Sequence, residues 1–220
     1  MRYNGEWLVC ALVFVTLAPA SASTIYFSGT FTQDDNQASF LVTLNTPRAV
    51  TIQTTSYANG GFAPVLSIFG NPLFAPGDPS LLGTNSGGSP CGVRGTNPSS
   101  GRCLDALLGN DSVLAADPLG TLPSGTYLVV LTEQANVPNG PDLAAGFAFD
   151  GQGNFTAIPG VNGGPFVDPS NPGITLTGAW ALQFDNVDAA ISEAVPESST
   201  YISVLAGLGI LVGARRRYAA

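Results

Sequence analysis

The stretch GTYLVVLT, residues 125–132, decides the fold class of this chain. Side chains alternate between the two faces of an extended strand, so Tyr127 to Leu131 in steps of two share one face and Leu128 to Thr132 share the other. Both faces are largely apolar, which is typical of a strand covered on both sides. We therefore predict that this segment is the central strand of a sheet.

Five other segments show the same alternation of apolar and polar residues. They are residues 25–31, 38–44, 50–55, 64–69 and 174–184. The chain contains 27 glycines and 17 prolines, turn residues separate the segments, and none has the periodicity of an amphipathic helix. Short strands without intervening helices predict an all-β fold, a β-sandwich or jelly roll, over residues 23–194.

The amino-terminal residues are typical of a secretory signal peptide. Arg2 provides a positive start, residues 7–17 form an apolar run, and Ala20-Ser21-Ala22 matches the small-residue cleavage pattern. We predict that residues 1–22 are removed by cleavage between Ala22 and Ser23. An uncleaved anchor is the alternative, although the apolar run is short for crossing a bilayer.

A second apolar segment lies near the carboxyl end. Residues 198–214 carry no charge and as a helix would be about 25 Å long, which is the lower limit for crossing a bilayer. Arg215, Arg216 and Arg217 follow directly, and arginines after a span stay on the cytoplasmic side. We predict one transmembrane helix with the domain outside, in a tail of residues 195–220.

The charge of the predicted domain is strongly negative. Between residues 23 and 193 there are three arginines and thirteen acidic residues, a net charge of −10, and the whole chain has no lysine and no histidine. This charge repels nucleic acid and anionic lipid, so neither is an expected partner. Such a negative charge is compatible with binding of cations or of neutral ligands such as glycans. The alternative is that the charge serves only to keep an exported protein soluble.

The residue inventory leaves little for catalysis. Without histidine, Ser-His-Asp and Cys-His arrangements are excluded, and without lysine a Walker-type phosphate loop is excluded. A pair of carboxylates for glycoside hydrolysis remains open. We therefore expect that the protein is not an enzyme.

Two cysteines belong to the predicted domain. Cys10 leaves with the signal peptide, whereas Cys91 and Cys103 lie in a Gly/Ser/Pro-rich stretch within residues 70–110, which we expect to be a long insertion. An even pair in an exported chain predicts a disulfide between Cys91 and Cys103.

The segment between the first two predicted strands could bind a metal ion. Asp34, Asp35 and Asn36 place two carboxylates and an amide together, and Ca²⁺ prefers such oxygen ligands. The same residue types also stabilise a polar turn through Asx hydrogen bonds, so a calcium site and a turn both remain open. A second oxygen-rich loop, residues 150–154, does not match the spacing of an EF-hand.

Several aromatic residues could form a platform that stacks on sugars if they are exposed, or fill the core if they are not. They are Tyr57, Phe62, Phe147, Phe149 and Phe155.

The tail resembles the PEP-CTERM sorting signal of Gram-negative bacteria. Val195, Pro196 and Glu197 precede the apolar helix, and Arg215–Arg217 end it, although Ser198 stands where that motif usually has a second proline. The resemblance implies recognition by an exosortase, a membrane-embedded peptidase that removes the anchor and passes the protein to the cell surface or extracellular matrix. An ordinary single-span anchor is the alternative.

The predicted domain is similar to a family of PEP-CTERM proteins and to bacterial pre-peptidase C-terminal domains. The residues that carry the similarity are 29–35, 60–69, 123–127 and 146–156. The resemblance implies a jelly-roll module associated with calcium and with carbohydrate or matrix binding, and it supplies no catalytic residues.

We therefore expect a non-enzymatic exported protein of the cell surface or extracellular matrix, structural or associated with exopolysaccharide and biofilm. It would be anchored in the inner membrane by its carboxyl-terminal helix before processing. A calcium-dependent carbohydrate-binding module and a glycoside hydrolase are the alternatives.

Overall fold

The computed structural model describes residues 23–70, 79–87, 97, 101–109, 119–160 and 163–193. The predicted signal peptide and sorting tail lie outside these residues. Within them no helix is long and apolar enough to cross a membrane, and the predicted span at 198–214 is not among them.

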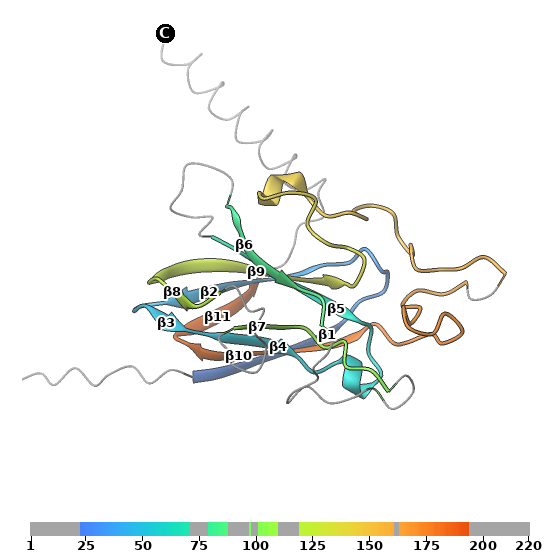
Figure 1. Ribbon diagram of the computed structural model, residues 1–220, viewed down its shortest axis with the longest axis horizontal. Coiled ribbons are helices and arrows are strands. Elements are labelled where there is room, and N and C mark those ends of the chain that lie inside the picture. Colours follow the sequence, from blue (N-terminus) through green and yellow to red (C-terminus); the bar gives the residue numbers. More distant parts are fainter. Residues whose placement is uncertain are drawn as a thin grey trace, which may run out of the picture.

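Two antiparallel sheets form the fold (Figure 1). The first has the order β1-β10-β4-β7, with β1 at Ser23–Thr30, β10 at Ala179–Val187, β4 at Thr51–Thr54 and β7 at Leu107–Gly109. The second has the order β11-β2-β9-β5-β6, with β11 at Ala189–Glu193, β2 at Ala38–Leu44, β9 at Gly125–Glu133, β5 at Pro64–Phe69 and β6 at Leu81–Asn85. Short strands β3 (Arg48–Ala49) and β8 (Thr121–Leu122) pair separately, and the 3₁₀ turns η1 (Tyr57–Asn59) and η2 (Leu143–Ala145) are the described helical elements.

The two sheets stack as a sandwich, and the predicted all-β fold is confirmed. Among the nine strands of these sheets, the chain changes sheet at every connection except the β5–β6 hairpin. Residues far apart in sequence therefore become strand neighbours, as when β1 pairs with β10 from Ser23 to Thr30.

Strand β9 is central in its sheet, as predicted. Tyr127, Val129 and Leu131 face the core between the sheets, whereas Leu128 and Val130 pack in a second cluster with residues of β5 and of the segment that follows β9. The physical reason is that both faces of the strand are apolar and each needs its own cover.

Large apolar side chains from both sheets fill the core. Phe40 packs its ring near those of Phe27 and Phe184, with centroids 4.9 Å and 5.6 Å away. The largest fully buried apolar residues are Tyr57, Phe40, Phe62, Phe69, Phe184, Leu44, Ile52, Leu66, Ile68, Leu108, Leu131 and Leu182. Each such side chain contributes about 1.5–3 kcal/mol by leaving water.

Three features of the fold differ from the sequence-based expectation. Residues 70–110 are not merely an insertion, because β6 and β7 lie within them and each closes one edge of a sheet. The last long strand begins at Ala179 rather than at residue 174, and β11 was not predicted. Strands of three to five residues are too short for an alternation pattern to be distinguishable from chance.

The long connection from β9 to β10, residues 134–178, covers one end of the sandwich and part of the outer face of the second sheet. Figure 1 shows it as the yellow and orange segment that extends beyond the strands. Phe147 packs over the outer face of β9, and Leu143 packs against the same cluster. This connection supplies Thr156, which donates a hydrogen bond to Asp34, and the buried residue Asp168.

Candidate functional site

The predicted calcium segment forms a turn, and Asp34 is its buried member. No surface of Asp34 is exposed, and its carboxylate accepts hydrogen bonds from the N–H of Phe166 at 2.6 Å and from the N–H and hydroxyl of Thr156 at 2.7 and 2.5 Å. Because N–H and O–H donors occupy both carboxylate oxygens, the side chain fastens the 134–178 connection to the sandwich. These hydrogen bonds favour the interpretation of residues 34–36 as a polar turn over their interpretation as a calcium site.

Asp35 and Asn36 also form hydrogen bonds within the protein. Asn36 Oδ1 accepts from the N–H of Thr32 at 2.9 Å and from the N–H of Gln33 at 3.1 Å. Asp35 Oδ2 accepts from the N–H of Gly153 at 2.8 Å, whereas its buried Oδ1 has no hydrogen-bond partner. Within the described residues no group of three or more Asp, Glu or Cys side chains could hold a metal ion, and the calcium site stays a prediction.

A cavity of about 400 Å³ lies beside this turn, at the same end of the sandwich. Glu133, Gln134, Thr156 and Asp168 supply its polar lining. Its apolar lining consists of Ala135, Ile158, Val167, Pro169 and Pro172. A concave surface of this size, mostly apolar with a few convergent polar groups, is the common form of a small-molecule site.

Glu133 is a buried carboxyl group in the lining of this cavity. Only 2% of its surface is exposed, and burial raises the pKa of its carboxyl to about 7, with the nearby charge of Asp34 raising it further. Hydrogen bonds from the backbone N–H groups of Ala135 and Gln134 partly oppose the rise. Near neutral pH the carboxyl therefore exchanges between its neutral and charged forms.

Asp168 also lines this cavity and is fully buried. Its Oδ1 accepts from the N–H of Ser170 at 2.8 Å, and the hydroxyl of Tyr57 lies 3.3 Å from Oδ2. Asp105, also fully buried, accepts from the N–H groups of Tyr57 and Ala58 at 3.0 and 2.9 Å. These acids act as acceptors that hold loops in place.

The predicted aromatic platform separates into two groups. Tyr57, Phe62 and Phe147 are buried in the core clusters. Phe149 and Phe155 remain half-buried and stack on each other, with ring centroids 4.1 Å apart and planes at 16°. Only this pair, in the segment just before Thr156, retains surface that a ligand could contact.

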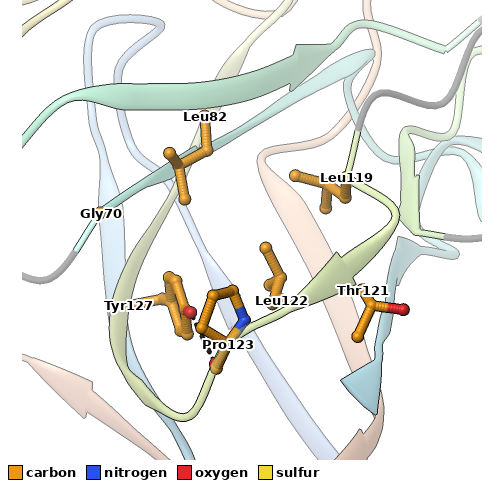
Figure 2. Close-up of a pocket in the computed structure, with 7 residues that line it drawn as sticks. All are labelled: Gly70, Leu82, Leu119, Thr121, Leu122, Pro123 and Tyr127. Atoms are coloured by element: carbon orange, nitrogen blue, oxygen red, sulfur yellow. Dashed lines mark hydrogen bonds between the residues drawn. The ribbon is translucent and has the colours of Figure 1, made fainter. Parts of the chain in front are cut away.

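A second cavity, of about 380 Å³, lies at another part of the sandwich and is mostly apolar. Figure 2 shows Leu82, Leu119, Leu122 and Tyr127 around it. The Tyr127 hydroxyl donates to the carbonyl of Pro123 at 2.7 Å, and burial raises the pKa of Tyr127. Among the described residues no Asp, Glu or Arg lines this cavity, and Tyr127 is its titratable group.

Sequence reasoning did not identify Glu133, Asp105 or Asp168. Glu133 is the charged residue that ends the apolar run of β9, and Asp168 precedes a proline in a turn-forming stretch. Both signals are weak, because charged residues at strand ends and Asp-Pro turns are also common where they have no binding function.

Of the remaining predicted residues, Ser23 and Cys103 belong to the described part of the chain. Ser23 is the first residue of β1, whereas Ala22, Val195–Glu197 and Arg215–Arg217 lie outside the described residues. Cys103 is disulfide-bonded, and Cys91 lies outside the described residues.

The described residues form an all-β sandwich with a largely apolar cavity at one end, and the buried acids Glu133 and Asp168 line this cavity. No protein-family model matches the chain, and no curated protein matches it.

Proposed function

We propose that this chain is a non-enzymatic exported protein of the cell surface or extracellular matrix, sorted by an exosortase-type peptidase. The observation that carries the proposal is the pairing of two targeting segments in one sequence. A signal-peptide pattern occupies residues 1–22, and a motif, an apolar stretch and Arg215–Arg217 occupy residues 195–220. Between them lies an acidic β-sandwich, and the chain has no histidine and no lysine.

The use of the acidic side chains supports a structural role. Asp34, Asp105 and Asp168 accept hydrogen bonds from backbone N–H groups of loops, and the chain has no histidine or lysine to act as a partner in acid–base catalysis. Carboxylates engaged in this way stabilise long loops on the sandwich.

The strand order supports assignment of the domain as a jelly roll. Eight strands divide into the orders β1-β10-β4-β7 and β2-β9-β5-β6, with β11 added at one edge of the second sheet. Two antiparallel sheets that exchange strands at almost every connection are the jelly-roll arrangement.

Cell fractionation in the native host tests the proposal. We expect the released protein to begin at Ser23 by mass spectrometry and to reach the cell surface or medium. The double substitution Pro196→Ala with Glu197→Ala should hold it in the inner membrane, whereas Glu193→Ala, just outside the motif, should leave sorting unchanged. Full-length chain in the cytosol with residues 1–22 intact would overturn the proposal.

A second candidate function is the binding of a neutral carbohydrate at the Glu133–Asp168 cavity. The cavity presents hydrogen-bond acceptors within apolar walls, and the stacked pair Phe149 and Phe155 belongs to the same connection. Sugar hydroxyls donate to such acceptors, and sugar C–H faces pack on apolar walls.

Affinity electrophoresis of the exported protein in gels containing dextran, xylan or the host's own exopolysaccharide tests this second candidate. Retardation that Glu133→Gln weakens and the exposed substitution Asp142→Asn does not would support it. Equal mobility in all gels would count against it, and release of reducing ends would indicate a glycoside hydrolase instead.

A further inference from the structure

The two most exposed large apolar side chains among the described residues lie on neighbouring strands. Tyr26 of β1 is 69% exposed and Ile191 of β11 is 59% exposed. Strands β1 and β11 are edge strands of the two sheets and contact each other along one edge of the sandwich. Because Ile25 and Ala190 pack toward the core, Tyr26 lies on the outer face of the first sheet and Ile191 on the outer face of the second. Tyr26 is therefore the exposed apolar residue that belongs to the edge strand β1.

Strand β1 has a backbone edge that no strand of the described region pairs with. It pairs with β10 on one side, and no described strand lies on its other side. Sheet edges are normally protected from association by charges, prolines, bulges or short length. Strand β1 is eight residues long, STIYFSGT, and contains no charge and no proline, and its one irregularity lies at its start, between Ser23 and Ile25.

The inner face of β1 is also incompletely covered. Ile25 and Phe27 pack against the core but remain half-buried, whereas Phe40 and Phe184 next to them are fully buried. A strand with a neighbour on one side only cannot cover its inward side chains completely. A second strand along this edge would bury both of them.

The charge of the domain indicates what kind of surface could pair here. A net charge of −10 over residues 23–193 makes two copies repel each other across most surfaces. The outward side chains of β1 are Thr24, Tyr26, Ser28 and Thr30, all of them neutral. This edge is therefore one where two copies can approach without placing like charges opposite each other.

The sequence of β1 is also complementary to itself in an antiparallel pair. A two-fold axis perpendicular to the sheet at Tyr26 places Tyr26 opposite Tyr26 of the second copy on the outer face. The same axis places Ile25 opposite Phe27 of the second copy on the inner face, and Thr24 opposite Ser28. Aromatic and apolar cross-strand pairs of this kind stabilise antiparallel sheets, and a two-fold contact is the commonest form of self-association.

We propose that two copies of this chain associate through β1, which pairs antiparallel with β1 of the second copy about an axis at Tyr26. The pairing joins the two four-stranded sheets into one continuous sheet of eight strands. This proposal goes beyond the proposed function and does not depend on sorting, because it concerns only the folded sandwich.

Sedimentation equilibrium of the exported wild-type protein provides the first test. We expect a dimer at micromolar concentration, and a monomer across the whole range would overturn the proposal. Ser28→Lys places a charge on the β1 edge and should raise the dimer dissociation constant about tenfold or more. Thr84→Lys, at an exposed position of the edge strand β6, is the matched control and should leave the constant unchanged.

Cross-linking in cells tests the register without relying on a charged variant. Tyr26→Cys in the full chain should give a disulfide-linked dimer on a non-reducing gel, because the proposed axis brings residue 26 of the two copies together. Thr84→Cys should not. Equal dimer yields from the two variants, or equal weakening by Ser28→Lys and Thr84→Lys, would contradict pairing through β1.

Discussion

The carboxylate of Asp34 accepts hydrogen bonds from both the backbone N–H and the hydroxyl of Thr156, which lies 122 residues further along the chain. Asp34 belongs to the turn between β1 and β2, and Thr156 belongs to the long connection between β9 and β10. One buried side chain therefore holds the 134–178 connection to the sandwich.

Replacement of Asp34 by Asn should lower the free energy of unfolding by about 3 kcal/mol. Hydrogen bonds to a charged group contribute about 1.5–3 kcal/mol, and the substitution leaves buried donors of Thr156 and Phe166 without a charged acceptor. Urea denaturation measures the change. Asp142→Asn, at an exposed residue with no side-chain capping bond, should change the value by less than about 0.5 kcal/mol.

Calcium at millimolar concentration should leave the melting temperature unchanged, because protein donors already occupy both oxygens of Asp34. If the site does bind calcium, a free calcium concentration of about one hundred times the dissociation constant would add about 2.7 kcal/mol to the free energy of unfolding. Differential scanning calorimetry with calcium and with EDTA distinguishes the two. A calcium-dependent rise that Asp34→Ala and Asp35→Ala abolish would establish the calcium site instead of the turn.

The stability of the protein should fall as pH rises from about 4.5 to about 7. The pKa of Glu133 is about 7 in the folded protein and 4.5 ordinarily, so in this range the folded state binds more protons than the unfolded state. Stability from this group is therefore fully present below pH 4.5 and is lost through pH 7, a change of about 3 kcal/mol.

Urea denaturation at several pH values measures this dependence, and Glu133→Gln should remove most of it because the amide does not titrate. The matched control is Glu193→Gln, at an exposed residue of β11, which should keep the wild-type slope. An identical slope in the Glu133→Gln protein would show that other groups cause the dependence.

Substitution of Gly178 by Ala should destabilise the sandwich by about 3 kcal/mol. A Cβ atom there would overlap the carbonyl of Phe31 and the ring of Phe166, and the N–H of Phe31 donates to the Gly178 carbonyl at 2.8 Å, so the backbone has no room to move. Thermal unfolding measures the loss. Gly163→Ala, where a Cβ would meet nothing within 4 Å, should have little effect.

Part of the candidate site could be anticipated from sequence. The turn at Asp34–Asn36 was identified as one of two alternatives because Asp and Asn between two strands favour turns. The roles of its members were not predictable, since the donors to Asp34 come from Thr156 and Phe166 in a loop without any periodic pattern. Glu133 carried no local signal that its pKa would rise, because that rise depends on the cover given by distant loops.

The sequence by itself determined the all-β class, the central position of β9 and the acidic, histidine-free surface. The first two properties follow from the alternation of apolar residues within single segments, and the third follows from counts of residue types. Neither kind of signal requires knowledge of which segments are neighbours in space. Only the tertiary structure decided which strands are neighbours, that β6, β7 and β11 complete the sheets, and that Asp34, Glu133 and Asp168 gather at one end. The hydrogen bond from Thr156 to Asp34 joins residues 122 positions apart, and contacts of this kind depend on how whole layers pack rather than on any short stretch of residues.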